Sequence, residues 1–141
     1  QRMDIFPTLE GFLGHCLELE GFRDDCYIAT WSAYRVDGHT WEVLDMLSRV
    51  ESLTFADLHK KLSGRGVPED VHAGDVKELI RLGWVEEISG WYQITSSGRQ
   101  ARDQVEAETD RLFFAPWAGL NEADLEDLAC FAFRMRDGLI K

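Results

Sequence analysis

The sequence lacks the features that place a protein in a membrane, outside the cell or among the common enzyme classes. No stretch approaches the roughly 18 consecutive apolar residues that a membrane-spanning helix needs. Its start shows no basic segment followed by an apolar one, as a secretory signal would. It also contains no Gly-x-Ser-x-Gly, no phosphate-binding glycine loop and no His-Glu-x-x-His. We therefore expect a cytoplasmic protein that is not an enzyme.

Cysteine is scarce as well. The three cysteines, Cys16, Cys26 and Cys130, are too few and too scattered for a disulfide framework. His15 stands beside Cys16, but no second close pair completes a four-ligand zinc site. We expect buried free thiols, no metal site and no cofactor.

Positive charge is the third scarcity, with 15 basic residues against 26 acidic ones and a net charge of −11. This balance opposes general attraction to nucleic acid or to an anionic membrane. The distribution is uneven, however. The range 54–99 holds six basic and seven acidic residues, a net of −1, so the remaining nine and nineteen give −10. The acid is therefore concentrated outside the segment that a DNA-binding protein would use.

A length of 141 residues, 45% of them hydrophobic, fits one domain spanning 1–141. Thr8 can cap a first helix that ends at Gly21. The apolar spacing and the cap signals predict helices over 9–20, 24–36, 40–50, 54–62, 68–82, 97–114 and 122–137.

The middle of the chain carries the clearest local signals. Thr54, with Asp57 three residues on, is typical of a helix start, and Pro68 is typical of a first helical position. The period then changes to that of strands over 84–88 and 91–95, around the two-residue turn Ser89-Gly90. A lone two-stranded hairpin must pack on helices. The expected fold is mainly α: a winged helix-turn-helix core over 40–99, with a two-stranded β-hairpin wing, between flanking helices in 1–39 and 100–141.

Three segments in this order resemble the MarR-type winged-helix family. They are "ELIRLGWVEE" at the end of a recognition helix, "ITSSGR" at the exit of the wing, and "GLNEADLEDL" at the start of the last helix. The segments "ETDRLFFAPW" and "DGH" also resemble MarR-related helix-turn-helix proteins of actinobacteria. The likeness covers about two-thirds of the chain. It implies a DNA-binding transcriptional regulator that acts as a homodimer, with a small-molecule pocket between the dimer helices and the winged helix.

The candidate DNA contacts are cations and one histidine near the motif. On helix 68–82, Asp70, Gly74, Lys77 and Arg81 form an outward stripe beside Asp75 and Glu78, while Ala73, Val76, Leu79, Ile80 and Gly83 are expected inward. Lys77 or Arg81 could touch a phosphate or a guanine edge; alternatively, Arg81 pairs with Glu78 on a solvated face. The further candidates for DNA contact are Lys60, Lys61, Arg65, His72 and Arg99.

Each further candidate also has a structural alternative. Asp57 can pair with Lys61 at i,i+4, and His72 can be a surface or half-buried residue. The hairpin itself departs from the family, because MarR wings carry an arginine near the tip. Here Glu86 and Glu87 precede the tip, and the hairpin carries no lysine or arginine until Arg99. We therefore expect the helices, and not the wing, to carry any DNA binding.

The aromatic residues Trp31, Tyr34, Trp41 and Trp117 could line the small-molecule pocket, or they could belong to the core. The first and last helices carry more apolar residues than one core needs. Phe131 and Phe133 cannot both face the same core, which favours a homodimer interface there. The alternative function is a winged-helix module that binds a protein or a ligand and not DNA, or the C-terminal part of a larger protein.

Overall fold

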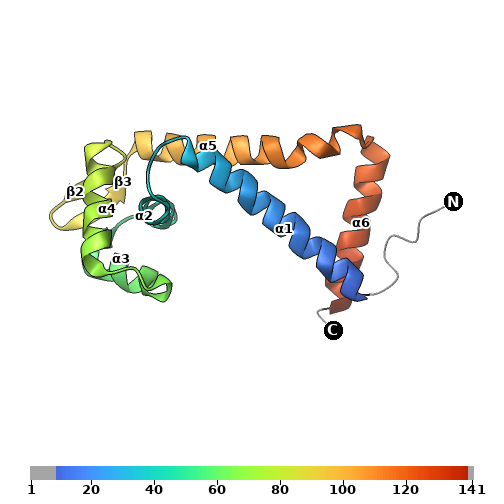
Figure 1. Cartoon of the computed structure of the whole chain (residues 1–141), viewed down its shortest axis with the longest axis horizontal. Helices are drawn as coiled ribbons and strands as arrows, with labels where there is room; N and C mark the ends of the chain where they lie inside the picture. The colour runs from blue at the N-terminus through green and yellow to red at the C-terminus, as the bar shows by residue number, and fades with distance from the viewer. Residues whose placement is uncertain (1–8, 140–141) are drawn as a thin grey trace.

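The computed structural model describes residues 9–139, a mainly helical chain with a small sheet near one end (Figure 1). In chain order the elements are α1 (Leu9–Ser32), α2 (Gly38–Ser48), β1 (Leu53–Thr54), α3 (Phe55–Leu62), η1 (Ser63–Arg65), α4 (Glu69–Arg81), β2 (Val85–Ile88), β3 (Trp91–Ile94), α5 (Ser96–Phe114), η2 (Ala115–Gly119) and α6 (Glu122–Leu139). Within these residues no helix is long and apolar enough to span a membrane.

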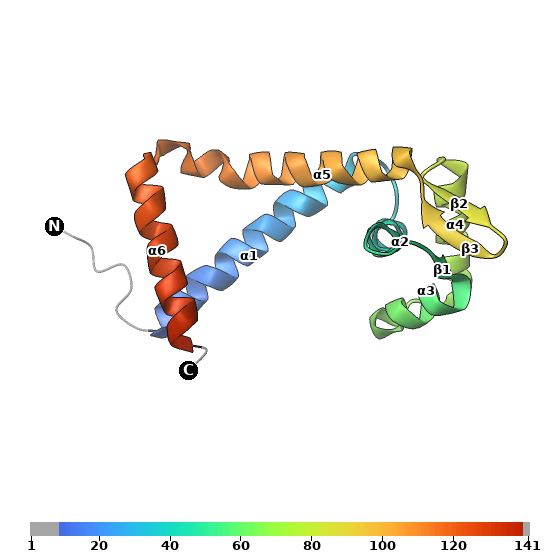
Figure 2. The same cartoon turned by 180° about the vertical axis from the view of Figure 1, so that it is seen from behind.

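The long helix α5 connects the two ends of the molecule. The elements from α2 to β3 gather at its start, and α6 turns away sharply at its far end (Figures 1 and 2). Helix α1 runs obliquely from the free end of α6 back to α5, against which it packs. The sheet and the helices around it therefore form one end, α6 forms the other, and α1 runs between them.

The buried core lies almost entirely at the end that contains the sheet. Its apolar side chains are Trp41, Val43, Leu44, Leu47, Leu53, Leu58, Leu62, Val76, Leu79, Val85, Ile94 and Val105. From α1 only Cys26 is buried among the side chains whose exposure is described, and from α6 none is. The predicted winged-helix fold is thus confirmed, and α5 contributes Val105 to its core.

Two expectations about the cysteines and the last helix are wrong for this single chain. Cys16 and Cys130 are exposed free thiols, and only Cys26 is buried. The residues expected to face inward on α6 (Leu125, Leu128, Ala129, Ala132 and Met135) are exposed or, for Met135, half-buried. Since α6 packs on no core of its own chain, its apolar side chains remain open to solvent.

The two helices predicted over 9–36 are one continuous helix, α1. Gly21, expected to end the first, lies in the interior of α1. Glycine costs a helix only about 1 kcal/mol relative to alanine, and contacts with α5 hold the residues that follow this position. Arg23 bonds Glu106 at 3.2 Å, for example. The expected helix cap Thr8 lies outside the described residues.

The sheet has three antiparallel strands in the order β1-β3-β2, and not the two that were predicted. The extra strand β1 is short: Leu53 pairs with Tyr92, and Thr54 pairs with Trp91. Thr54 then caps α3, because its hydroxyl accepts a hydrogen bond from the backbone N–H of Asp57 at 3.2 Å. Thr54, which signals a helix start, therefore also belongs to the edge strand of the sheet.

The predicted hairpin turn is confirmed. Ser89 and Gly90 both have positive φ, 53° and 85°, as the tight turns that match the twist of a hairpin require. Cross-strand register follows from this turn, with Ile88 opposite Trp91 and Val85 opposite Ile94. Val85 and Ile94 are buried, whereas Ile88 and Trp91, next to the turn, are exposed.

Gly98 lets α5 start directly against the hairpin. A Cβ at this position would lie 2.2 Å from the carbonyl oxygen of Trp84. Thr95 caps the helix here by accepting from the Gly98 N–H at 3.1 Å. The same residue ties the strand to the loop, since its hydroxyl donates to the carbonyl of Gly83 at 2.7 Å.

Helix α4 is held by buried polar contacts as well as by apolar ones. Asp75 is only 4% exposed. Its Oδ1 accepts from the Thr40 hydroxyl and pairs with His39 Nδ1, each at 2.6 Å. One turn earlier, His72 Nδ1 lies 2.8 Å from His59 Nδ1 of α3. One of these two nitrogens must accept, so in this arrangement at least one of the two rings is neutral.

These contacts correct the predicted orientation of α4. Asp75, expected beside the outward stripe, is buried, and Ile80, expected inward, is 38% exposed. Ala73 is half-buried. The buried positions are His72, Asp75, Val76 and Leu79.

We expect Gly98→Ala to lower the free energy of unfolding by about 1–3 kcal/mol, because the methyl group would overlap the Trp84 carbonyl. Urea unfolding followed by tryptophan fluorescence at fixed protein concentration measures this. Gly74→Ala is the matched control: it has open space around its Cβ position, and it should raise stability by up to about 1 kcal/mol. Equal effects of the two substitutions would contradict the close approach at Gly98.

Thr40→Val keeps the shape of the side chain but removes one donor from the buried Asp75 carboxylate. We expect a loss of about 1–3 kcal/mol in the same unfolding assay. Thr30→Val is the control, because the Thr30 hydroxyl bonds a helix carbonyl on its own helix; its effect should stay within about 0.5 kcal/mol. A neutral Thr40→Val would show that the Thr40 bond does not help to hold α4.

Candidate nucleic-acid interface

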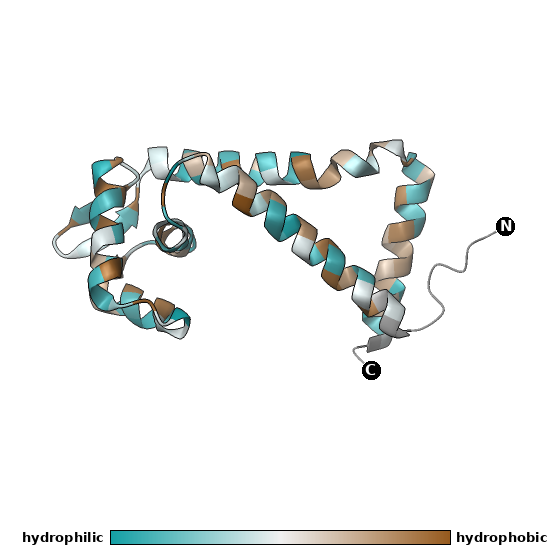
Figure 3. Ribbon diagram, in the orientation of Figure 1, coloured by the Kyte–Doolittle hydropathy of each residue, from teal (hydrophilic) through white to brown (hydrophobic). Residues whose placement is uncertain are grey.

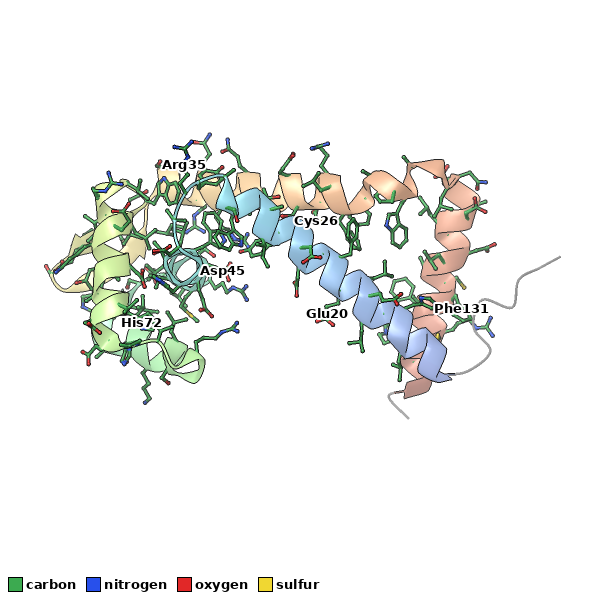
Figure 4. All side chains as sticks on the ribbon, viewed as in Figure 1. Glu20, Cys26, Arg35, Asp45, His72 and Phe131 are labelled. Atoms are coloured by element: carbon green, nitrogen blue, oxygen red, sulfur yellow. The ribbon has the colours of Figure 1, made fainter. Side chains whose placement is uncertain are left out.

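The outward face of α4 matches the stripe expected from the sequence. Asp70, Gly74, Lys77 and Arg81 are all exposed and recur at helical spacing along one side. The opposite side of α4 carries the buried His72 and the core residues. In Figure 4 the labelled His72 marks that inner side of α4, near α3. A helix locked on one side and charged on the other is suited to enter a groove.

Arg81 is engaged by Glu78 in a two-point contact. Its Nε donates to Glu78 Oε2 at 2.7 Å, and its Nη2 donates to Oε1 at 2.6 Å. The hydrogen bonds lower the pKa of Glu78 and raise the pKa of Arg81. The Arg81 and Glu78 side chains are 67% and 40% exposed, so this is a surface pair that a phosphate can replace. Lys77, by contrast, forms no ion pair with any part of the chain that the structure describes.

In the basic cluster of α3 and η1, Lys61 lacks the ion pair that the sequence suggested. Asp57, expected to pair with Lys61, instead accepts from the Thr54 hydroxyl at 2.7 Å. Lys60 and Lys61 are both exposed and make no ion pair within residues 9–139. Arg65 does have a partner, because its Nε donates to Glu42 at 2.9 Å.

Two further candidates occupy quite different environments. Arg99 is exposed at the start of α5, and its Nη1 donates to the carbonyl of Ser48 at 3.5 Å. That carbonyl belongs to the last residue of α2, where the helix dipole favours a cation. His72 is 1% exposed, and such burial does not fit a phosphate or base contact. It serves the packing of α3 on α4.

The wing presents carboxylate and apolar groups but no cation. Glu86 accepts from the amide of Gln93 at 2.8 Å on one face of the hairpin. Ile88 and Trp91 share that face and are about half exposed. The backbone of this hairpin can approach a duplex, but its side chains offer no positive charge to a phosphate.

The four aromatic residues expected at a pocket separate into two groups. Trp31, Tyr34 and Trp41 come together: the Trp31 and Trp41 rings are nearly parallel at 6.4 Å, and Tyr34 lies 5.7 Å from Trp41. Trp117 belongs to another cluster, 5.9 Å from Phe113.

A cavity of about 490 Å³ lies between α1 and α2 beside the Trp31 and Trp41 rings. We call it the Trp31–Trp41 pocket. Tyr34 lines a different hollow, of about 730 Å³, between α1 and α5. Trp84 packs edge-on against Tyr34 and Trp41, an association that the sequence analysis missed.

The residues that hold α4 were also missed as a group. His39 and Thr40 lie at the start of α2, 35 or more positions before Asp75. One signal was available, because His72, Asp75, Val76 and Leu79 follow the i, i+3, i+4, i+7 pattern of a buried helix face. The pattern was not recognised because two of its four positions, His72 and Asp75, are polar. Among the described residues no group of three or more His, Cys, Asp or Glu side chains is placed to hold a metal ion.

Comparison with known proteins agrees with this geometry. The sequence profile of the helix-turn-helix family matches residues 19–141. Among solved structures, the multiple antibiotic-resistance repressor MarR of Listeria monocytogenes is similar, with 15% identity, a TM-score of 0.81 and 94% of each chain covered. A comparison with curated proteins gave no match.

Two other solved structures are similar at lower TM-scores. A MarR family protein of Mycobacterium tuberculosis in complex with DNA is 18% identical, with a TM-score of 0.59 over 92% of this chain and 98% of that one. The reduced form of MarR from E. coli is 20% identical, with a TM-score of 0.56 over 92% and 94%. The fold expected from the MarR resemblance is thus confirmed, and this chain belongs to the helix-turn-helix family.

Proposed function

We propose that this protein is a transcriptional regulator that binds double-stranded DNA as a homodimer, with α4 in the major groove. The observation that carries the proposal is the division of α4 into two faces. His72 and Asp75 are fixed inside the protein, while Lys77 and Arg81 are exposed on the other side. The similar fold of a MarR family protein in complex with DNA supports it.

Lys77 and Arg81 are the side chains of α4 that suit a base edge or a phosphate. Lys77 has no ion-pair partner among the described residues, whereas Arg81 must break its contact with Glu78 to bind the nucleic acid. Around them, Lys60 and Lys61 on α3 are uncommitted cations that suit the flanking phosphates. Arg65 and Arg99 can join them only by giving up the contacts described above. Each protomer therefore makes few phosphate contacts.

The homodimer is proposed from apolar surface on α1 and α6. Leu17 of α1 is 66% exposed, and Leu128 and Phe133 of α6 are 44% and 57% exposed. Figure 3 shows hydrophobic stretches along both helices, away from the sheet. Soluble monomers rarely expose contiguous apolar surface of this kind. A two-fold contact between these helices of two copies would bury it.

A small-molecule site is a second candidate function, favoured by the Trp31–Trp41 pocket. Binding sites for small molecules are concave, largely apolar and lined by aromatic rings with a few polar groups. This pocket combines both indoles with Tyr27, whose hydroxyl accepts from Trp41 Nε1 at 2.6 Å. The pocket borders α2, and residues of α2 bond Asp75 on α4. A ligand in the pocket could therefore affect the position of the DNA-binding helix.

Replacing Lys77 and Arg81 together by alanine should abolish retention of sheared genomic DNA, because it removes both cations of the α4 face. Glu86→Gln in the wing should leave retention unchanged or improve it slightly. Both variants change exposed side chains, so the fold is expected to persist. Unchanged retention by the double variant would show that α4 is not the reading helix.

The salt dependence of the same retention assay counts the phosphates that are neutralised. Three uncommitted lysines per protomer predict a slope of log K against log [salt] of about −2.7 per protomer. A slope about twice as steep would mean that Arg65, Arg81 and Arg99 also contact phosphates. No retention even at low salt would overturn DNA binding and favour the protein- or ligand-binding module.

Light scattering at tens of micromolar should give the mass of a dimer. Leu128→Glu on α6 should shift the protein towards the monomer, because it places a charge in the proposed apolar interface. Ile88→Glu is the matched control: the same change at a side chain that is 53% exposed on the wing. It should leave the mass unchanged. A monomeric wild-type protein would contradict the homodimer.

A further inference from the structure

The Trp31–Trp41 pocket has an unusual combination of linings, aromatic faces together with carboxylates. The aromatic part comes from Tyr27 and Trp31 of α1 and Trp41 of α2. Gly38 brings α2 close to the Trp31 ring, since a Cβ there would lie 3.4 Å from that indole. The electron-rich faces of indole rings attract cations within about 6 Å of the ring centre.

Three carboxylates line the same pocket: Asp24, Glu42 and Asp45. Arg65 also lines the pocket, and it balances Glu42 at 2.9 Å. Asp45 is bonded by Arg49 at 2.7 Å and approached by Arg102 at 3.6 Å. Figure 4 labels Asp45 on α2.

Asp24, in contrast, has no hydrogen bond or ion pair within residues 9–139. Its carboxylate is exposed at the pocket and remains available for an incoming positive charge.

The surroundings of the pocket are also acidic. Arg102, which approaches Asp45, is shared with Asp103 and Glu106. The pKa of the Tyr27 hydroxyl is raised, first by burial, against the lowering effect of its hydrogen bond with Trp41; the charges of Asp45 and Glu106 raise it further, and Arg102 opposes them. The carboxylates near this hydroxyl disfavour an anionic ligand.

We propose that the Trp31–Trp41 pocket binds a small organic cation with an aromatic or alkyl-ammonium group. The cation lies against the half-buried indole of Trp31, behind which Trp41 is packed, and Asp24 supplies its counter-charge. This inference rests on the small-molecule site proposed above and assigns its ligand class. It does not depend on DNA binding.

The test uses three probes of similar size that differ in charge: benzyltrimethylammonium, its uncharged isostere neopentylbenzene, and the anion phenylacetate. Binding is followed through the indole N–H signals of Trp31 and Trp41 in NMR spectra of the full chain. We expect benzyltrimethylammonium to shift these signals in a saturable way. Neopentylbenzene should bind at least about threefold more weakly, since it loses the cation–π and charge contributions.

Asp24→Asn should weaken benzyltrimethylammonium binding by about threefold, the size expected for a solvent-accessible ion pair. It should leave neopentylbenzene binding unchanged. The matched control is Asp127→Asn, an equal loss of charge at an exposed position on α6, which should leave both affinities as they were. Since Asp24 is exposed, its substitution should not unfold the chain.

Each other outcome overturns part of the account. If neopentylbenzene or phenylacetate binds at these indoles as tightly as benzyltrimethylammonium, the cation assignment is wrong, while the small-molecule site stands. If Asp24→Asn and Asp127→Asn have equal effects, Asp24 is not the counter-charge. If none of the three probes shifts the indole signals, both the cation assignment and the small-molecule site fall. DNA retention by the same samples reports on the DNA-binding proposal separately.

Discussion

A buried carboxylate on α4 determines which side of that helix reaches solvent. Asp75 accepts from Thr40 and pairs with His39 at 2.6 Å each, and it is 4% exposed. Removing a donor from a buried charged acceptor is costly, so turning α4 about its axis would break the hydrogen bonds of Asp75 Oδ1. The exposed positions of Lys77 and Arg81 follow from this constraint. The proposed DNA contact thus depends on polar contacts between α4 and the start of α2.

Charge and apolar surface are divided between the two ends of the molecule. The segment 54–99 is nearly neutral, and the rest of the chain carries a net charge of −10. The general field therefore opposes approach to DNA, and only local cations favour it. The opposite end exposes leucine and phenylalanine side chains on α1 and α6. Two copies joined there would present two α4 helices, as a two-fold symmetric DNA site requires.

Local signals predicted the winged helix well, because each depends on neighbouring residues. The Thr54 cap and the Ser89-Gly90 turn both have reasons within a few positions of the chain. What failed depends on distant partners. Gly21 does not break α1, because α5 supports that helix. The inner face of α4 was misjudged, because His72 and Asp75 are polar and their partners His39, Thr40 and His59 are remote in sequence.

The central claim is that α4, and not the acidic wing, reads the DNA. Dimethyl sulfate interference on a retained duplex tests it most directly, because the reagent methylates guanine N7 in the major groove and adenine N3 in the minor groove. The account predicts that methylation of guanine N7 within each half-site prevents binding, since Lys77 and Arg81 address that edge. Methylation of adenine N3 should be tolerated. Interference at flanking adenine N3 with guanine N7 tolerated would contradict the account and assign the contact to the wing.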